Sequence, residues 1–127
     1  MLNEIDKQEV GGCLELINLN INEQIMMHLC EYLRKKKLKY SMMKLVKNGI
    51  TDEGMRILLS YLLTDNFTKV LNLTGNHVTQ KSLDMLSTFV EHNQILKSIY
   101  LSNNKINSFQ LKSRKKTFDK FYVEVNI

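Results

Sequence analysis

The sequence lacks several features that would point to particular classes of protein. Its 127 residues include no proline, no tryptophan and only five glycines, so no proline- or glycine-rich linker separates two domains. No apolar run approaches the ~18 residues that a membrane-spanning helix needs. The first ten residues include three acidic ones, which does not fit an export signal. We therefore expect a single domain over residues 1–127 with a cytoplasmic location and no membrane span.

Residue types that carry chemistry are also sparse. Cys13 and Cys30 have no metal-ligand or redox spacing. A disulfide between them is possible, but two reduced thiols are expected in the cytosol. The histidines fall in different layers of the repeat described below, and no phosphate loop, nucleophile elbow or carboxylate pair is present. We expect no enzyme activity, no catalytic residue, no metal, no cofactor and no small-molecule substrate.

What the sequence does contain is a repeat with a period of 28 residues. Three segments align without a gap and share the pattern L-x-x-L-x-L-x-x-N-x-L, with loose fits at the first position. They are residues 40–50, 68–78 and 96–106, and their asparagines are Asn48, Asn76 and Asn104. An earlier copy begins at Gly11, is one residue longer, and has Leu19 in place of the asparagine, as suits an end repeat.

This pattern resembles the leucine-rich repeat family, and its period is nearest to the ribonuclease-inhibitor-like type. The resemblance implies an α/β leucine-rich repeat solenoid, a right-handed β-α superhelix whose short curved parallel sheet carries helices on its convex side. Repeats would start near residues 11, 40, 68 and 96, between an N-terminal cap over 1–10 and a degenerate C-terminal unit over 107–127. The three asparagines would be structural, with amides that bond turn backbone in neighbouring units.

The residues after each motif support the same register. The position after the last apolar residue is Asn22, Thr51, Thr79 and Asn107, and all four are good helix N-caps. Apolar residues then recur at helical spacing. Each unit is therefore a strand, a turn and a returning helix. Strands stack about 4.8 Å apart and helices about 8–10 Å apart, which makes the strands line a concave face.

Alternation along each expected strand sends the leucines into the core and the intervening side chains onto the concave face. A middle row that mixes charge, amide and aromatic groups predicts a protein-protein interaction module. The proposed binding residues are Glu15, Met42, Lys44, Val46, Asn72, Thr74, Tyr100, Ser102 and Glu124. The middle row is expected to read Glu15, Lys44, Asn72, Tyr100 and Glu124, and Tyr122 and Asn126 to complete the face.

The apolar members of this face cluster in its N-terminal half. They are Ile17, Met42, Val46 and Val70. They either form a sticky patch for the partner or pack under the N-terminal segment. The whole face offers on the order of 400–500 Å², whereas a standard interface needs about 800 Å² per partner. Binding is therefore weak unless the turns join in, through Asn18, Lys47, His77, Asn103 and Lys105.

Two basic runs support an alternative function, nucleic-acid or acidic-surface binding, which suits the formal charge of +5. The runs are residues 34–39 and 112–116. The first is expected at a helix C-terminus, where the helix dipole already favours lysine. Stacking at 8–10 Å per helix separates the runs by roughly 25–30 Å, so they do not form one patch. Nucleic acid is the less favoured partner for this reason.

Two further expectations remain open. The chain could be a bacterial-type effector or a regulatory repeat protein that acts on a host or cellular protein, secreted into a host cell without a classical signal peptide. Residues 108–118 could form a final helix. Residues 122–127 alternate like a final strand that arrives early, since Val123 would match Ile99 at an offset of only 24 residues. Such a strand would end the sheet with unpaired backbone groups, which predicts weak self-association through this C-terminal edge.

Overall fold

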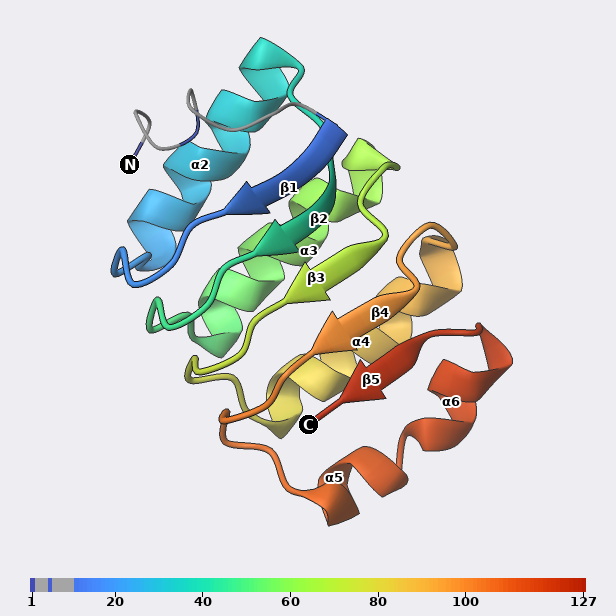
Figure 1. Ribbon diagram of the computed structural model, residues 1–127. Coiled ribbons are helices and arrows are strands. Elements are labelled where there is room, and N and C mark those ends of the chain that lie inside the picture. The colour runs from blue at the N-terminus through green and yellow to red at the C-terminus, as the bar shows by residue number, and fades with distance from the viewer. Residues whose placement is uncertain (2–4, 6–10) are drawn as a thin grey trace.

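The computed structural model describes residues 1, 5 and 11–127. Strands and helices alternate along the chain (Figure 1). Their bounds are β1 (Gly11–Glu15), α2 (Glu23–Lys36), β2 (Tyr40–Lys44), α3 (Asp52–Asp65), β3 (Val70–Asn72), α4 (Gln80–His92), β4 (Ser98–Tyr100), α5 (Ser108–Lys112), α6 (Lys115–Lys120) and β5 (Glu124–Asn126). The N-terminal cap expected over residues 1–10 lies, except for Met1 and Ile5, outside the described residues.

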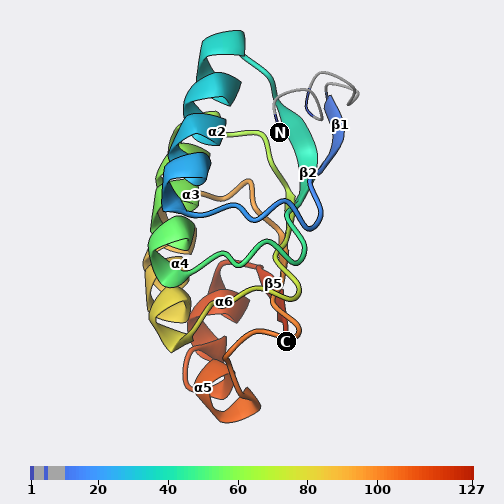
Figure 2. The ribbon, with the colours of Figure 1, turned by 90° about the vertical axis from the view of Figure 1, so that its left-hand side faces the viewer.

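The five strands form one parallel sheet in the order β1-β2-β3-β4-β5, so neighbours in sequence are neighbours in space. Figure 2 shows the helices gathered on one side of this sheet. The α/β architecture with a parallel sheet is therefore as expected. The pairing joins equivalent repeat positions, since Met43, Leu71 and Ile99 are successive Cα partners.

The core lies between the two layers and is built from the repeated apolar positions. Leu45 and Leu73 occupy equivalent positions directly after β2 and β3, and both are fully buried. The helices contribute a stripe at helical spacing, for example Met55, Leu58 and Leu62 in α3, which are also buried. Because each unit buries its apolar surface against the next one, the units stabilise each other rather than fold alone.

All four predicted N-caps are confirmed. The side chain of Asn22 accepts a hydrogen bond from the Ile25 N–H at 2.9 Å, and Thr51 does the same for Gly54 at 3.4 Å. Thr79 accepts from the Lys81 N–H. Before α5, Asn107 forms a reciprocal capping box with Gln110. These bonds satisfy N–H groups that have no partner within the helix and fix where each helix begins.

The C-terminal unit differs from the prediction in two ways. A single helix was expected after residue 107, but the chain breaks near Ser113 into the short helices α5 and α6. The final strand also begins later than expected. Tyr122 has a left-handed backbone (φ 57°) and stands before the strand instead of in it. The Val123 N–H bonds the Phe118 carbonyl in the turn that closes α6.

The later start of β5 changes its register. Val125 pairs with Ile99, an offset of 26 residues where 24 was expected. Asn126 therefore lies opposite Tyr100, and Glu124 lies opposite Ser98. A shift of two residues keeps each side chain on its expected face because strand side chains alternate with a period of two.

Candidate functional site

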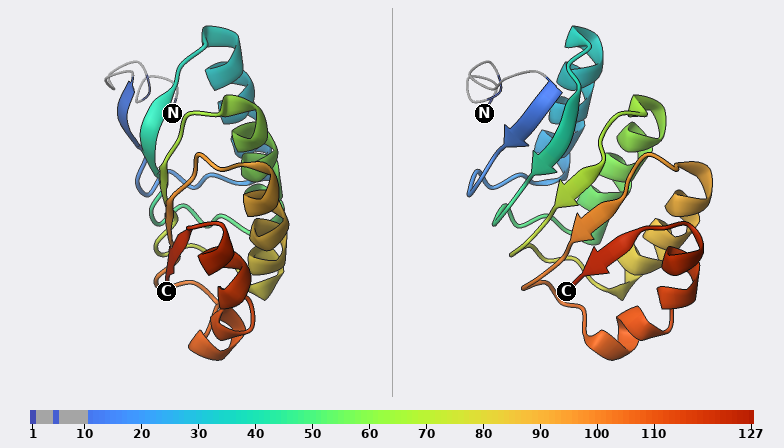
Figure 3. Two further views of the ribbon diagram at one scale, coloured as in Figure 1. Left: turned by 90° about the vertical axis from the view of Figure 1, so that its right-hand side faces the viewer. Right: turned by 45° about the vertical axis from the view of Figure 1, so that its right-hand side comes forward.

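One face of the sheet is turned away from the helices (Figure 3), and it is here called the open face. It carries three rows of side chains. The pairing of Cα atoms defines the first two rows, and alternation along the chain adds the third. The first row is Cys13, Met42, Val70, Ser98 and Glu124. The middle row is Glu15, Lys44, Asn72, Tyr100 and Asn126, and the third row is Ile17, Val46, Thr74 and Ser102.

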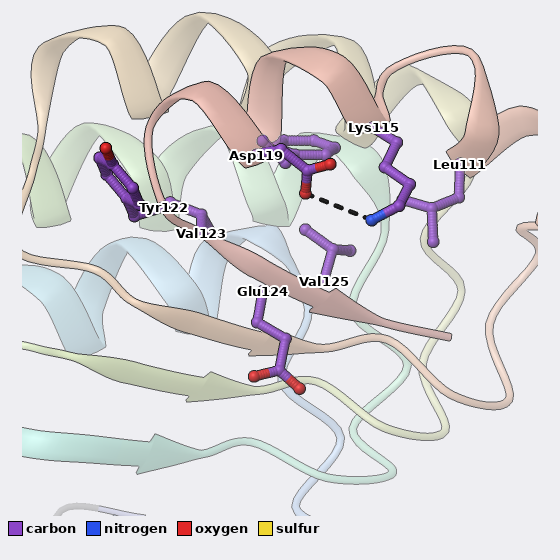
Figure 4. A pocket seen from close by; sticks show the side chains of 8 residues that line it. Leu111, Lys115, Asp119, Tyr122, Val123, Glu124 and Val125 are labelled. Atoms are coloured by element: carbon purple, nitrogen blue, oxygen red, sulfur yellow. Dashed lines mark hydrogen bonds and ion pairs between the residues drawn. The ribbon is translucent and has the colours of Figure 1, made fainter.

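All nine predicted binding residues lie on this face and are exposed or half-buried. One of them occupies a different place from the one expected. Glu124 belongs to the first row, and Asn126 takes its position in the middle row beside Tyr100. Figure 4 shows Glu124 pointing away from the helix layer, whereas Val125 points toward α6. The predicted face is thus correct for Glu124, and the predicted row is wrong.

The middle row combines unlike groups in close succession. Glu15 is the Cα partner of Lys44, which in turn is the partner of Asn72. The Asn72 Oδ1 accepts hydrogen bonds from the Thr74 N–H at 3.1 Å and from the Thr74 hydroxyl at 2.6 Å. Tyr100 is 37% exposed. The row therefore offers a carboxylate, an ammonium, an oriented amide and an aromatic ring on neighbouring strands.

The apolar side chains of the open face remain partly accessible. Ile17 is 43% exposed, and Met42, Val46 and Val70 are half-buried. Packing under the N-terminal segment was the second expectation for this cluster, and most of that segment lies outside the described residues. The exposed parts of these four side chains can therefore contribute apolar contact area to a partner.

The turns beside the open face are held by the three repeat asparagines. The Asn76 Oδ1 accepts from the N–H groups of Asn48 and Ile50 at 3.0 and 2.9 Å, and its Nδ2 donates to the carbonyls of Leu45 and Leu73, both at 2.8 Å. Asn48 and Asn104 bond their neighbouring turns in the same manner. Such bonding fixes the backbone of exposed turn residues, namely Asn18, Lys47, His77, Asn103 and Lys105.

The cysteines do not supply a reactive thiol. Both are free, with Cys13 half-buried on the open face and Cys30 buried in α2. Burial raises the pKa of Cys13, although the nearby Lys44 ammonium acts in the opposite direction. Burial raises the pKa of Cys30 to about 12. Both groups are therefore protonated thiols at neutral pH, whereas nucleophilic chemistry needs a thiolate.

Residues 1, 5 and 11–127 contain no group of three or more His, Cys, Asp or Glu side chains that could hold a metal ion. None of the helices described here is long and apolar enough to cross a membrane. The accessible chemistry of the open face is recognition by charge, hydrogen bonding and aromatic contact.

Sequence reasoning passed over two exposed lysines that the structure makes conspicuous. Lys69 immediately precedes β3 and Lys97 immediately precedes β4. They are one repeat period apart, so the alignment of the repeats contained the signal. Each is isolated in sequence, and attention to charged runs alone does not find them.

Comparison with known proteins supports a relationship to leucine-rich repeats. No protein-family model matches the chain. Over 94 residues, or 73% of its length, the chain is 32% identical to the NACHT, LRR and PYD domains-containing protein 4C of Mus musculus. The chain spans only 10% of that relative's length. The similarity therefore concerns a small part of the longer protein.

Solved structures share the fold at low sequence identity. The leiomodin-1 actin-binding site 2 matches with a TM-score of 0.77 and 16% identity, over 97% of this chain and 73% of that one. The tropomodulin C-terminal domain of Caenorhabditis elegans gives 0.73 and 17%, over 98% and 77%. The Chaetomium Mex67:Mtr2 subunits give 0.60 and 19%, over 90% and 78%. None of these names states an enzymatic activity.

Proposed function

We propose that this chain is a short leucine-rich repeat solenoid of the ribonuclease-inhibitor-like type that holds another protein on the concave, open face of its sheet. The repeat pattern, the asparagine bonding between turns and the relative with leucine-rich repeats in its name support the fold part of this proposal. The fold neighbours support a binding role only in general, and one of them is named for an actin-binding site.

The observation that carries the binding role is the middle row of the open face. Neither Lys44 nor Tyr100 makes a side-chain hydrogen bond or an ion pair within the described residues, so neither has a structural task there. Tyrosine gives a large contact area with few rotors to immobilise and is enriched among residues that dominate binding energy. The repeat asparagines fix the turns beside this row, and the exposed residues of those turns enlarge the surface toward the area that a standard interface needs.

The test is the double variant Lys44→Ala with Tyr100→Ala. Its melting temperature should stay within a few degrees of the wild type because both side chains point away from the core. Its affinity for a partner captured from the native cell should fall by more than about 2 kcal/mol, roughly thirtyfold. Actin is a reasonable purified protein to try first, given the name of one fold neighbour.

The matched control is Lys35→Ala with Lys36→Ala in the last turn of α2, on the other side of the molecule. This variant should bind the protein partner normally. If the α2 variant abolished binding and the open-face variant bound like the wild type, the proposed surface would be wrong. Capture of a host protein instead of one from the same cell would favour the effector or regulatory role over a cytoplasmic module.

Self-association through β5 is a separate prediction. This strand pairs on one side with β4 and is the last strand of the described sheet. Its outer backbone groups could pair with a second copy. Light scattering over a range of protein concentrations would detect the resulting dimer, and a constant monomer mass at high concentration would contradict the prediction.

A further inference from the structure

The four connections that lead from a helix to the next strand lie along one edge of the molecule (Figure 1). We call this the helix-to-strand edge and define it as the last turn of each helix, the following connection and the first residue of the next strand. It comprises residues 33–40, 62–70, 89–98 and 117–124. The first basic run, residues 34–39, belongs to this edge, and the second, residues 112–116, lies just outside it.

The helix-to-strand edge is strongly basic. Eight basic residues belong to it: Arg34, Lys35, Lys36, Lys37, Lys39, Lys69, Lys97 and Lys120. Four acidic residues do: Asp65, Glu91, Asp119 and Glu124. The difference is +4, most of the formal net charge of +5 that the whole chain carries. Lys69 and Lys97 lie between the lysines of α2 and Lys120, so the charge runs along the whole stack.

The acidic members of the edge offset half of the basic charge, and two of them are engaged by other groups. Asp65 is buried and accepts hydrogen bonds from Tyr61 and Thr68. Asp119 pairs at 3.2 Å with Lys115, which lies outside the edge. The carbonyl ends of the helices add partial negative charge. Lys39 contacts one of these carbonyl groups directly, since its Nζ donates to the Asp65 carbonyl at the end of α3 at 3.2 Å.

The opposite edge, where strands lead into helices, is neutral. Residues 15–26, 44–55, 72–83 and 100–111 contain four basic and four acidic side chains. Both edges have the same number of connections, so of the two edges only the helix-to-strand edge carries a net positive charge. The second basic run, residues 112–116, lies outside both edges.

Exposed apolar side chains are interleaved with these lysines. Leu63 is 43% exposed, Phe67 is 38% exposed and Tyr122 is 83% exposed, all on the helix-to-strand edge. Tyr122 has a left-handed backbone, which is uncommon for a bulky residue. Lys37 is left-handed at the end of α2, where glycine or asparagine is favoured. At the end of α3 the left-handed position is occupied by Asn66, which is one of the favoured residue types.

We propose that the helix-to-strand edge binds the surface of an anionic phospholipid bilayer. Seven of its eight basic residues are lysines, which act as point charges and suit diffuse attraction to a charged surface more than shaped recognition. Leucine, phenylalanine and tyrosine beside them can enter the headgroup region, where tyrosine is enriched. The sites extend along a line of four connections, which fits an extended flat partner.

This mode of binding leaves the middle row of the open face accessible. Val70, Ser98 and Glu124 belong both to the edge and to the first row of the open face, but Lys44 and Tyr100 in the middle row lie outside the edge. A protein partner on the middle row and a membrane at the edge could therefore be held together. The double variant Lys44→Ala with Tyr100→Ala should therefore bind vesicles as the wild type does. Loss of protein binding and loss of vesicle binding can thus be separated experimentally.

The test is sedimentation of the full chain with phosphatidylcholine vesicles that do or do not contain about 30% phosphatidylserine. The edge variant combines Lys35→Gln, Lys36→Gln and Lys37→Asn, three side chains that make no hydrogen bond or ion pair within the described residues. Each removed charge should weaken partitioning roughly fivefold, so the variant should lose roughly a hundredfold. Added salt should weaken the wild type steeply.

The matched control removes three lysines from the neutral edge, Lys47→Gln, Lys81→Gln and Lys105→Gln, which are also exposed. It has the same net charge as the edge variant and should lose less than about threefold because its charges lie far from the bilayer. Equal losses for the two variants would overturn the proposal. Wild-type protein that ignores phosphatidylserine would do so too, as would binding to a single-stranded oligonucleotide but not to vesicles at the same salt concentration.

A fluorescent probe tests the orientation independently of charge. The chain has no tryptophan, so Tyr122→Trp places a single reporter on the helix-to-strand edge. Its emission should shift to the blue when anionic vesicles are added. Phe109→Trp, at the 81%-exposed Phe109 of α5, is the matched control and should not shift. A shift at position 109 with none at 122 would overturn the proposed orientation.

Discussion

The central units of the stack and its C-terminal unit use the same strand pairing but are covered very differently. Helix α3 has 14 residues, seven of which are buried. Helices α5 and α6 have five and six residues, and together they contain one buried residue, Phe118 in α6. Strand register therefore continues into a unit with little helix. Strand pairing propagates the stack, and the helices supply about half of its buried apolar residues.

The thin cover leaves a hollow in the C-terminal unit. A cavity of about 480 Å³ opens between α6 and β5, lined by Leu111, Phe118 and Val125 among others (Figure 4). In the central units the corresponding side of the strands is filled by buried helix residues such as Leu58 and Leu62. We expect the two regions to differ most in the cost of removing apolar side chains.

The largest expected effect comes from an apolar position in the centre. Leu73 is fully buried, so Leu73→Ala should cost about 2–5 kcal/mol in the free energy of unfolding. Val125→Ala removes a half-buried side chain beside the hollow and should cost about 1 kcal/mol. Denaturant unfolding of the two variants checks this difference. If Leu73→Ala melted within a degree or two of the wild type, the central core would be misplaced.

The repeat asparagines offer a second comparison along the same stack. Asn76 is buried and its oxygen serves two backbone N–H groups, those of Asn48 and Ile50. The oxygen of the half-buried Asn104 serves one, that of Val78. Because unsatisfied buried donors are costly, Asn76→Ala should lose about 2–4 kcal/mol and Asn104→Ala about 1–2 kcal/mol. Equal losses in the free energy of unfolding would mean that the contribution of a repeat asparagine does not depend on its position in the stack.

A pH-dependent contact separates the two regions further. The Asp52 carboxylate at the start of α3 accepts bonds from the Thr79 N–H, the Thr79 hydroxyl and the Ser82 hydroxyl at 2.8, 2.5 and 2.6 Å. Burial raises the pKa of Asp52, but the bonds from Ser82 and Thr79 outweigh it and leave the pKa below its ordinary value of 3.8. Between α4 and α5 the corresponding contact is an amide pair, Gln80 and Gln110, at 3.3 Å.

The sign of the effect follows from the lowered pKa. The contribution of Asp52 is fully present above its ordinary pKa of 3.8 and is lost as the pH falls through the lower folded value. At neutral pH, Asp52→Asn should cost about 1 kcal/mol after allowance for solvent screening. At a pH below the folded pKa of Asp52 the variant and the wild type should converge. A difference that stays constant from pH 7 to acid would contradict this account, and Gln110→Ala should show no pH dependence.

The same contrast between regions explains what could be predicted from the sequence. In the centre, the 28-residue period fixed strands, N-caps and the open face, because each unit must match the one on either side of it. At the C-terminus this constraint weakens, and both the break at Ser113 and the register of Val125 were missed. Local turn geometry at Tyr122 decides that register, and no repeat spacing encodes it.

The candidate surfaces follow a similar rule. Strand alternation placed Lys44, Asn72 and Tyr100 correctly on one face because a period of two leaves no alternative. The helix-to-strand edge could not be found in this way. It gathers residues from four connections of unequal length, and Lys69 and Lys97 become neighbours only after the units stack, where the Lys97 N–H donates to the Lys69 carbonyl.

The smallest expected effect lies at the boundary of the two regions, where Arg114 joins the C-terminal unit to α4. The Arg114 Nε donates to the Asp84 carboxylate at 2.6 Å, and its Nη1 donates to the Gln110 carbonyl and the Ser113 hydroxyl, each at 2.7 Å. The Asp84 side chain is 62% exposed. Solvent and salt screen such a pair, so Asp84→Asn should cost less than about 0.5 kcal/mol. The cost should vanish in high salt.

Arg114→Ala should cost more, because it also removes the two bonds within the C-terminal unit. Unfolding curves at low and high salt distinguish the cases. A salt-independent loss above 1 kcal/mol for Asp84→Asn would show that this ion pair, rather than strand pairing, holds the C-terminal unit on the stack.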